Sequence, residues 1–162
     1  MELAKRMKER AKISCTGILE IIGYCQSLNS QTEVNNTHIY GVNDDFFTFH
    51  GFDSLTINPG EVVINRRLAD YLGVKHGEDL IIRFTEISDI PSDAPFAQDN
   101  KTTKYVVMKI GGILEPVKNG NFSLSISKIS PMNIFINLTD LEDKHVNSYK
   151  INRLLIKRDK NI

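Results

Sequence analysis

The stretch LADYLGVKHGEDLIIRF contains a cluster of one histidine and two acidic residues. Metal sites and general acid–base pairs are built from imidazole and carboxylate groups, which occur here at His76, Glu78 and Asp79. Such a site needs several groups that converge, and no HExxH, CxxC or similar spacing supplies them. The turn rules favour a simpler interpretation, in which Gly73 ends a helix and Gly77 takes a positive-φ turn position. We therefore expect a packing unit of helix, turn and strand with solvated acidic side chains.

A second group of the same residue types lies in VNDDFFTFH, which contains Asp44, Asp45 and His50. On a helix, at 100° per residue, Asp45 and His50 would point about 140° apart, and Asp44 and His50 about 240° apart. These side chains cannot share one ligand face. We expect instead a short capped helix that stacks Phe46 on Phe49 and anchors them in the core.

Motifs for nucleotide binding and nucleophilic catalysis are absent from the sequence, which has no GxSxG, GxxxxGK[ST] or GxGxxG. Cys15 and Cys25 have no histidine near them in sequence that would lower a thiol pKa. An extended run separates them at about 3.3 Å per residue, whereas disulfide-linked Cα atoms lie within about 7 Å. We expect two reduced, unpaired thiols, and no catalytic residue, cofactor or metal.

The overall charge of the chain is balanced, with 20 basic and 20 acidic residues among 162. Proteins that bind nucleic acid usually carry a basic excess, so we expect no nucleic acid partner. No window approaches the 18 or so apolar residues of a membrane-spanning helix, and the N-terminal basic residues lead into no signal-peptide core. A segment cut from a larger membrane protein would show the same pattern. The length predicts a single domain over residues 1–162, with two lobes as an option.

Hydrophobic periodicity and turn residues predict an α+β, strand-dominated fold with about seven strands and about four short helices. Strands are expected at 17–27, 37–42, 61–65, 80–84, 103–114, 133–138 and 152–157, and helices at 2–12, 44–50, 68–72 and 139–145. Local signals add a bulge at Gly111–Gly112, a hairpin turn at Asn119–Gly120 that leads into a strand over 121–127, Thr139 as a helix cap, and Tyr71 on a buried helix face.

The order of several segments is more specific than any one of them. HIYGVNDDFFTFHGF, PGEVVINRRLADYLGVKHGEDLIIRF, IPSDAPFA, GNFSLSISKISPMNIFINLTDLED and NRLLI follow one another along the chain. In this order, over residues 30–156, the chain resembles the extracytoplasmic (periplasmic) core domain of MacB/FtsX-like ABC transporter permeases. The most distinctive pieces are GVNDDFF, PGEVVINRRLA and IPSDAPFA. The resemblance implies a porter-like α+β lobe with an inserted strand-rich lobe.

The resemblance also implies a role without catalysis. In this family a cytoplasmic ATPase drives membrane helices, and the extracytoplasmic domain relays their motion to a substrate or partner on the far side. The chain would then lie between two membrane helices of a bacterial inner-membrane permease, on the periplasmic side. Its expected partners are those membrane helices, the ATPase, an extracytoplasmic protein or substrate, and a second copy in a homodimer.

The irregular segment IPSDAPFA is where we expect a partner or substrate contact, because apolar Phe96 stands among prolines. The contact residues would be Pro91, Asp93, Pro95 and Phe96. An alternative interpretation is a loop that packs over the core of the domain, which is common for connecting segments.

Two other classes of protein stay open at this point. The glycine–acid turn also resembles turns of small swapped-hairpin and double-psi barrels, some of which bind DNA. An unrecognised hydrolase would need a catalytic group assembled in space, and a pocket with histidine and serine within hydrogen-bond reach would favour it.

Overall fold

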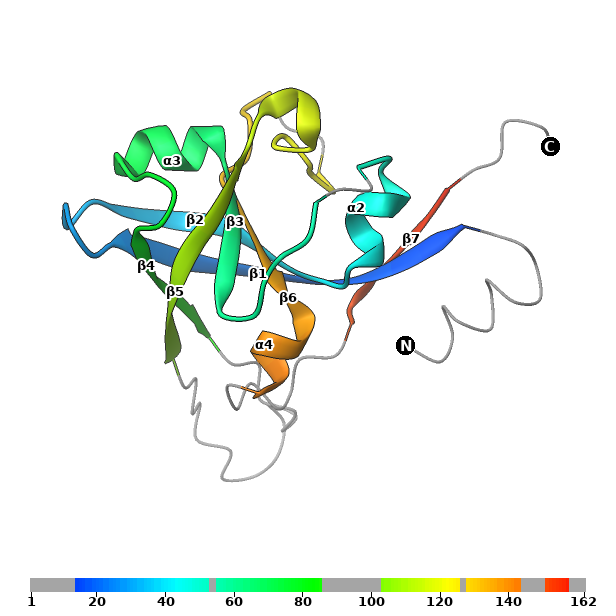
Figure 1. Ribbon diagram of the computed structural model, residues 1–162, viewed down its shortest axis with the longest axis horizontal. Coiled ribbons are helices and arrows are strands. Elements are labelled where there is room, and N and C mark those ends of the chain that lie inside the picture. The colour runs from blue at the N-terminus through cyan, green and yellow to red at the C-terminus, as the bar shows by residue number, and fades with distance from the viewer. Residues whose placement is uncertain (1–13, 53–54, 86–102, 126–127, 144–150, 158–162) are drawn as a thin grey trace, which may run out of the picture.

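Strand β1 (Cys15–Ser27) is the longest strand of the computed structural model, which describes residues 14–52, 55–85, 103–125, 128–143 and 151–157 (Figure 1). One edge of β1 pairs antiparallel with β2 (Glu33–Val42). The opposite edge pairs antiparallel first with β7 (Arg153–Ile156) and then with β4 (Asp79–Thr85). Residues 19–26 of β1 therefore pair along one edge, and residues 15–18 and 23–27 pair along the other.

Six strands close into a barrel. After β1 and β2, the ring continues through β6 (Asn133–Asn137), β3 (Glu61–Asn65) and β5 (Thr103–Leu114) to β4, which returns to β1. The β2–β6 and β3–β5 pairs are parallel, and the other pairs are antiparallel. Each strand of the ring has two neighbours, so the ring has no free edge. Strand β7 lies outside the ring beside the first residues of β1.

The predicted bulge in β5 is confirmed. Val62 of β3 pairs with Ile110, whereas Val63 pairs with Gly112, so Gly111 is the extra residue. A Cβ atom at Gly111 would collide with the carboxylate of Glu61. Glycine at this position therefore lets the bulged strand pass the Glu61 side chain.

The interior of the barrel is filled by side chains from alternate positions of the strands and by side chains from two helices. Helix α3 (Arg66–Leu72) and helix α4 (Leu138–Asp143) each bring leucines to this core. The interior cluster includes Leu19, Ile21, Cys25, Ile39, Val62, Ile64, Leu68, Leu72, Leu80, Ile82, Phe84, Met108, Ile110, Ile134, Ile136, Leu138 and Leu141. Burial of each such side chain is worth about 1.5–3 kcal/mol, so the barrel interior is the main source of stability.

A second, aromatic cluster covers part of the outer face of the barrel. Helix α2 (Asp45–Phe49) lies there and buries Phe46 and Phe47 (Figure 1). The ring of Phe122 meets Phe46 at 5.2 Å and Tyr40 at 5.0 Å between centroids, both edge to face. Such pairs add about 0.5–1.5 kcal/mol beyond burial. Phe49 is half-buried and contacts His50 at 5.0 Å.

The expected α+β, strand-dominated fold is confirmed, with seven strands and three short α-helices in the described residues. The helix expected at 2–12 lies outside the described residues. The expectation of Tyr71 on a buried face is wrong, because its side chain is 58% exposed. Thr139 is not the cap of α4: the Asn137 side chain accepts the backbone N–H of Thr139 at 3.1 Å. An asparagine one residue before the helix took the role assigned to the threonine.

The hairpin expected at Asn119–Gly120 is also wrong. Asn119, at φ 64°, instead ends a 3₁₀ turn, η1 (Pro116–Lys118), and the described residues 121–125 form no strand. Two buried asparagines hold this segment as a loop. The Nδ2 groups of Asn65 and Asn133 both donate to Gly120 O, at 2.9 and 3.1 Å, and Asn133 also donates to Phe122 O at 2.7 Å. These side chains satisfy carbonyls that a hairpin ladder would otherwise pair.

The helix–turn–strand unit at 68–84 has the predicted backbone conformation. Gly73 ends α3 at φ 68°, and Gly77 has φ 87°. The turn is tied to β5, since Gly77 N–H donates to Ile110 O and Ile110 N–H donates to Glu78 O, each at 2.8 Å. The side chain of Glu78 does more than face solvent: it accepts the N–H of Lys75 at 2.9 Å and so shapes the turn.

We predict that the buried and exposed residues of this unit differ sharply in their effect on stability. Leu72, 1% exposed, lies in the interior cluster, so Leu72→Ala should lower the free energy of unfolding by about 2–5 kcal/mol. His76 is exposed, and His76→Ala should change it by no more than about 0.5 kcal/mol. Thermal and urea melts of the two variants measure this, and equal losses would contradict the packing role.

A separate prediction concerns the backbone of the turn. Gly77→Val should destabilise the fold by about 1–2 kcal/mol or more, because a β-branched residue is penalised at positive φ. No described atom lies within 4 Å of the position of a Cβ at Gly77, so a clash cannot cause the loss. Gly77→Asn is the matched control and should lose less, since asparagine tolerates this conformation. Equal melting temperatures for both variants would contradict the explanation.

Candidate functional site

The predicted contact residues Pro91, Asp93, Pro95 and Phe96 lie outside the described residues. The expectation of a contact at this segment therefore stays a prediction. The other polar groups singled out in the sequence can be placed in the fold.

The acidic residues and histidine of the α2 segment do not form a joint site. Asp45 Oδ1 accepts the hydroxyl of Thr16 at 2.8 Å, whereas His50 Nδ1 lies 2.8 Å from the carbonyl of Phe46. Asp44 is exposed at the cap position of α2, and its side chain makes no capping hydrogen bond. This separation agrees with the angles predicted from the sequence. A shallow hollow beside α2, open to solvent, is lined by Asp44, Phe47 and Ile57 among others.

The described parts of the chain show neither a group of metal ligands nor a serine bonded to His38 or His50. No three histidine, cysteine or acidic residues gather there in a way that could hold a metal ion. The side-chain contacts of His38 go to Glu20 and Tyr40, and that of His50 goes to a carbonyl, so neither histidine faces a described serine at hydrogen-bond distance.

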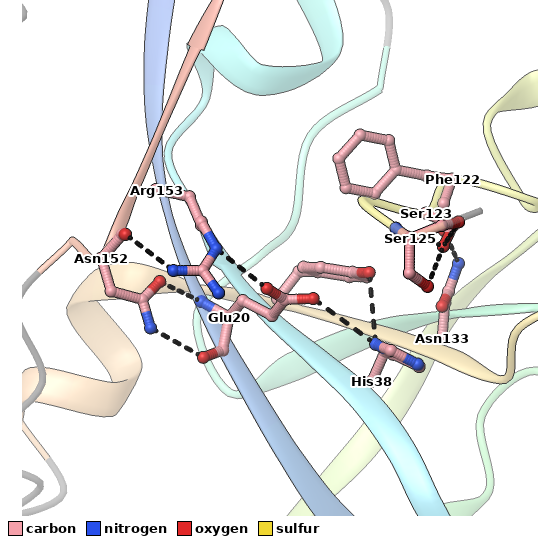
Figure 2. Close-up of polar contacts among 9 residues, drawn as sticks. Glu20, His38, Phe122, Ser123, Ser125, Asn133, Asn152 and Arg153 are labelled. Atoms are coloured by element: carbon pink, nitrogen blue, oxygen red, sulfur yellow. Dashed lines mark hydrogen bonds and ion pairs between the residues drawn. The ribbon is translucent and has the colours of Figure 1, made fainter.

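A polar cluster on the outer face of β1 is the main feature that the sequence did not predict. Glu20 projects from β1, and its carboxylate lies between two nitrogen groups (Figure 2). Its Oε2 is 3.2 Å from Arg153 Nε of β7, and its Oε1 is 3.6 Å from His38 Nδ1 of β2. This carboxylate therefore contacts strands on both sides of β1. The Glu20 side chain is only 15% exposed, so the contacts are largely shielded from water.

The main chain of Glu20 is held as well. Asn152, one residue before β7, accepts the Glu20 N–H through Oδ1 at 2.8 Å and donates from Nδ2 to the Glu20 carbonyl at 2.8 Å (Figure 2). One amide side chain thus makes the same two hydrogen bonds that a neighbouring strand would make. The sequence signal was the single charge of Glu20 within the apolar run GILEIIG, which marks a carboxylate that needs partners.

Tyr40 of β2 also belongs to this cluster, because its hydroxyl lies next to His38. Burial raises the pKa of the Tyr40 hydroxyl, and the charge of Glu20 raises it further, so the group stays protonated. Its oxygen lies 3.5 Å from His38 Nδ1. The cluster brings together a carboxylate, an imidazole and a phenol. This arrangement links three strands.

The two cysteines lie on the same strand and are not joined in a disulfide. Both side chains are fully buried. Burial raises the pKa of Cys25 to about 11, and its contact with Thr37 Oγ1 at 3.4 Å lowers it by less. The expectation that the two cysteines are unpaired is confirmed, and their reduced state stays a prediction. Cys25 is a core residue rather than a nucleophile.

We predict that the thiols react only after unfolding. A pKa of about 11 leaves Cys25 with about a hundredfold less thiolate at neutral pH than a thiol at its usual value of 9.0. Iodoacetamide should therefore label the native chain slowly. In denaturant without reductant, mass spectrometry should show two added groups. A denatured chain that takes up label only after reduction would show that the thiols are oxidised.

The comparisons with known proteins give a fold likeness and no sequence match. No family model and no curated protein sequence matches the chain. The solved structure of the periplasmic region of MacB from Actinobacillus actinomycetemcomitans aligns with 98% of this chain and 64% of its own, at a TM-score of 0.57 and 12% identity. The chain therefore spans slightly less than two thirds of that periplasmic region.

A second solved structure is a domain from Porphyromonas gingivalis that is assigned to a permease protein. It aligns with 99% of this chain and 68% of its own, at a TM-score of 0.55 and 15% identity. No helix among the described residues is long and apolar enough to cross a membrane. The expected resemblance is confirmed at the level of the fold, which the chain shares with 64% of the periplasmic region of MacB.

Proposed function

We propose that this chain is a non-catalytic, extracytoplasmic domain of a bacterial ABC transporter permease. In this proposal it relays the ATPase-driven motion of membrane helices to a substrate or partner outside the inner membrane. The likeness to two periplasmic and permease domains supports the class of protein. Fold alone does not define function, so the proposal depends on a feature of the chain itself.

The feature that carries the proposal is the pairing of the two ends of the described chain. Cys15 lies opposite Ile156 in the antiparallel pair of β1 and β7, and the N–H of Lys157 donates to Ser14 O at 2.9 Å. Because the strands are antiparallel, the chain enters and leaves the domain at the same place (Figure 1). A domain inserted between two consecutive membrane helices needs both ends on one side, and the β1–β7 pair provides this.

The closed barrel supports a role in transmitting motion. A ring without free edges, filled by one continuous interior cluster, cannot open along a strand without breaking a complete ladder of hydrogen bonds. A displacement applied at the paired ends would therefore move the barrel as one body. The partners in this proposal are the membrane helices and ATPase of the same transporter, and a partner protein, substrate or second copy on the far side.

We predict that the domain is reached by reagents from outside the inner membrane in the intact permease. Val117 is 86% exposed, so Val117→Cys should react with a membrane-impermeant maleimide in whole cells whose outer membrane has been permeabilised. The native thiols are buried and should contribute little background. Gel mobility of the labelled permease measures the reaction.

Ala69→Cys is the matched control, because Ala69 is 1% exposed and should be labelled only after denaturation. Labelling of Val117→Cys that needs lysis of the inner membrane would place the domain in the cytoplasm and refute the proposal. Recovery of the native protein in the soluble fraction would refute it as well.

A further inference from the structure

The edge of β1 that faces β7 and β4 contains a gap, meaning a stretch of residues that pairs with no described strand. Strand β7 pairs with residues 15–18 of β1, and β4 pairs with residues 23–27. Both strands lie on the same edge of β1. The carbonyl of Ile18 accepts the N–H of Asn152, and the N–H of Leu28, just past β1, donates to the carbonyl of Asp79. Ile18 and Leu28 are an even number of residues apart, so their main-chain groups point to the same edge. None of the described strands pairs with residues 19–22 along this edge, while β2 continues along the other one.

This gap separates two structural parts that share β1. One part is the barrel. The other, here called the arm, consists of residues 15–18 of β1 with β7, and it carries the paired ends of the described part of the chain. The arm has only four register pairs, and a two-stranded ribbon of this length is marginally stable alone. Leu155 of β7 packs against the aromatic cluster, whereas residues 19–22 of β1 pair with no described strand along this edge.

The side chain of Asn152 fills the gap at Glu20. Its amide closes both main-chain hydrogen bonds of Glu20 at 2.8 Å, in the place where the next residues of a strand would otherwise lie. The Glu20 carboxylate then reaches Arg153 of the arm through one oxygen and His38 of the barrel through the other. A single residue of β1 is thereby fixed to both parts (Figure 2).

We propose that Glu20, Asn152 and Arg153 form a joint that fixes the arm to the barrel, so that a displacement of the chain ends turns the barrel with it. The joint is a positioning device for the relay, and its importance for transport rests on the function proposed above. The rigidity of the joint does not depend on that function, because it can be measured on the isolated chain.

Hydrogen exchange tests the hydrogen bonds of the joint. Asn152→Ala removes both contacts to the Glu20 main chain, so exchange of the Glu20 amide and of the β7 amides should accelerate at least about tenfold. Barrel amides such as that of Ile82 should keep their rates. Asn35→Ala is the matched control, because Asn35 is an exposed asparagine of β2, and it should leave all these rates unchanged. An unchanged rate at Glu20 in Asn152→Ala would overturn the proposal.

Distance measurements test the rigidity of the joint. Spin labels at Ile156→Cys in β7 and Val107→Cys in β5, which are 52% and 46% exposed, report the position of the arm relative to the barrel. The isolated chain should give one narrow distance distribution, and Asn152→Ala or Glu20→Gln should broaden it. Glu33→Gln, an exposed glutamate on β2, serves as the control for charge. A broad distribution in the otherwise unaltered chain would refute the joint.

The same label pair separates the joint from the proposed function. In the intact permease, the arm-to-barrel distance should stay the same with and without ATP, while a label on the barrel moves relative to a membrane helix. Asn152→Ala should reduce that barrel movement without lowering the melting temperature of the barrel. If the isolated chain is rigid but nucleotide moves nothing, the relay function fails and the joint stands. A nucleotide-dependent change between arm and barrel would refute the joint.

Discussion

The use of both edges of β1 is the constraint on which the rest of the structure depends. Residues 23–26 of β1 pair with β2 on one side and with β4 on the other, and this double pairing closes the barrel. Closure decides which side chains are interior, so it assigns Ile21 and Cys25 to the core and Glu20 to the outer face. It also leaves the first residues of β1 outside the ring, where they can pair with β7 and bring the chain ends together.

Local signals in the sequence were sufficient for most elements of the fold. Gly73 and Gly77 have the positive φ angles that the turn rules require, and Gly111 forms the bulge in β5. These features depend on a few neighbouring residues and on steric rules that hold in any protein. The alternation of Ile134 and Ile136 with Phe135 likewise predicted a strand, and the two sets pack in the interior cluster and in the aromatic cluster respectively.

Two of the features that escaped prediction, the loop at Asn119–Gly120 and the contacts of Glu20, depend on partners far away in the sequence. Asn119–Gly120 has the local signature of a hairpin, yet Asn65 and Asn133 bind the carbonyl of Gly120 and hold the segment as a loop. Glu20 stood out as a charge in an apolar strand, but its partners Asn152 and Arg153 lie more than a hundred residues away. Local propensity cannot indicate which distant side chain will satisfy a backbone group. The segment with Pro91 and Phe96 lies outside the described residues, so its expected contact keeps the standing of a sequence prediction.

The side chains of the joint occupy a place where a continuation of β7 would meet the end of β4. A longer β7 would run along residues 19–22 of β1 toward the position that the end of β4 occupies next to residue 23. The amide of Asn152 satisfies Glu20 without placing more backbone in that space. The carboxylate of Glu20, 15% exposed, keeps an ionic contact that water would weaken at a fully exposed site. The chain thus ties its arm to a closed barrel through side chains, along the stretch of this edge of β1 that pairs with no described strand.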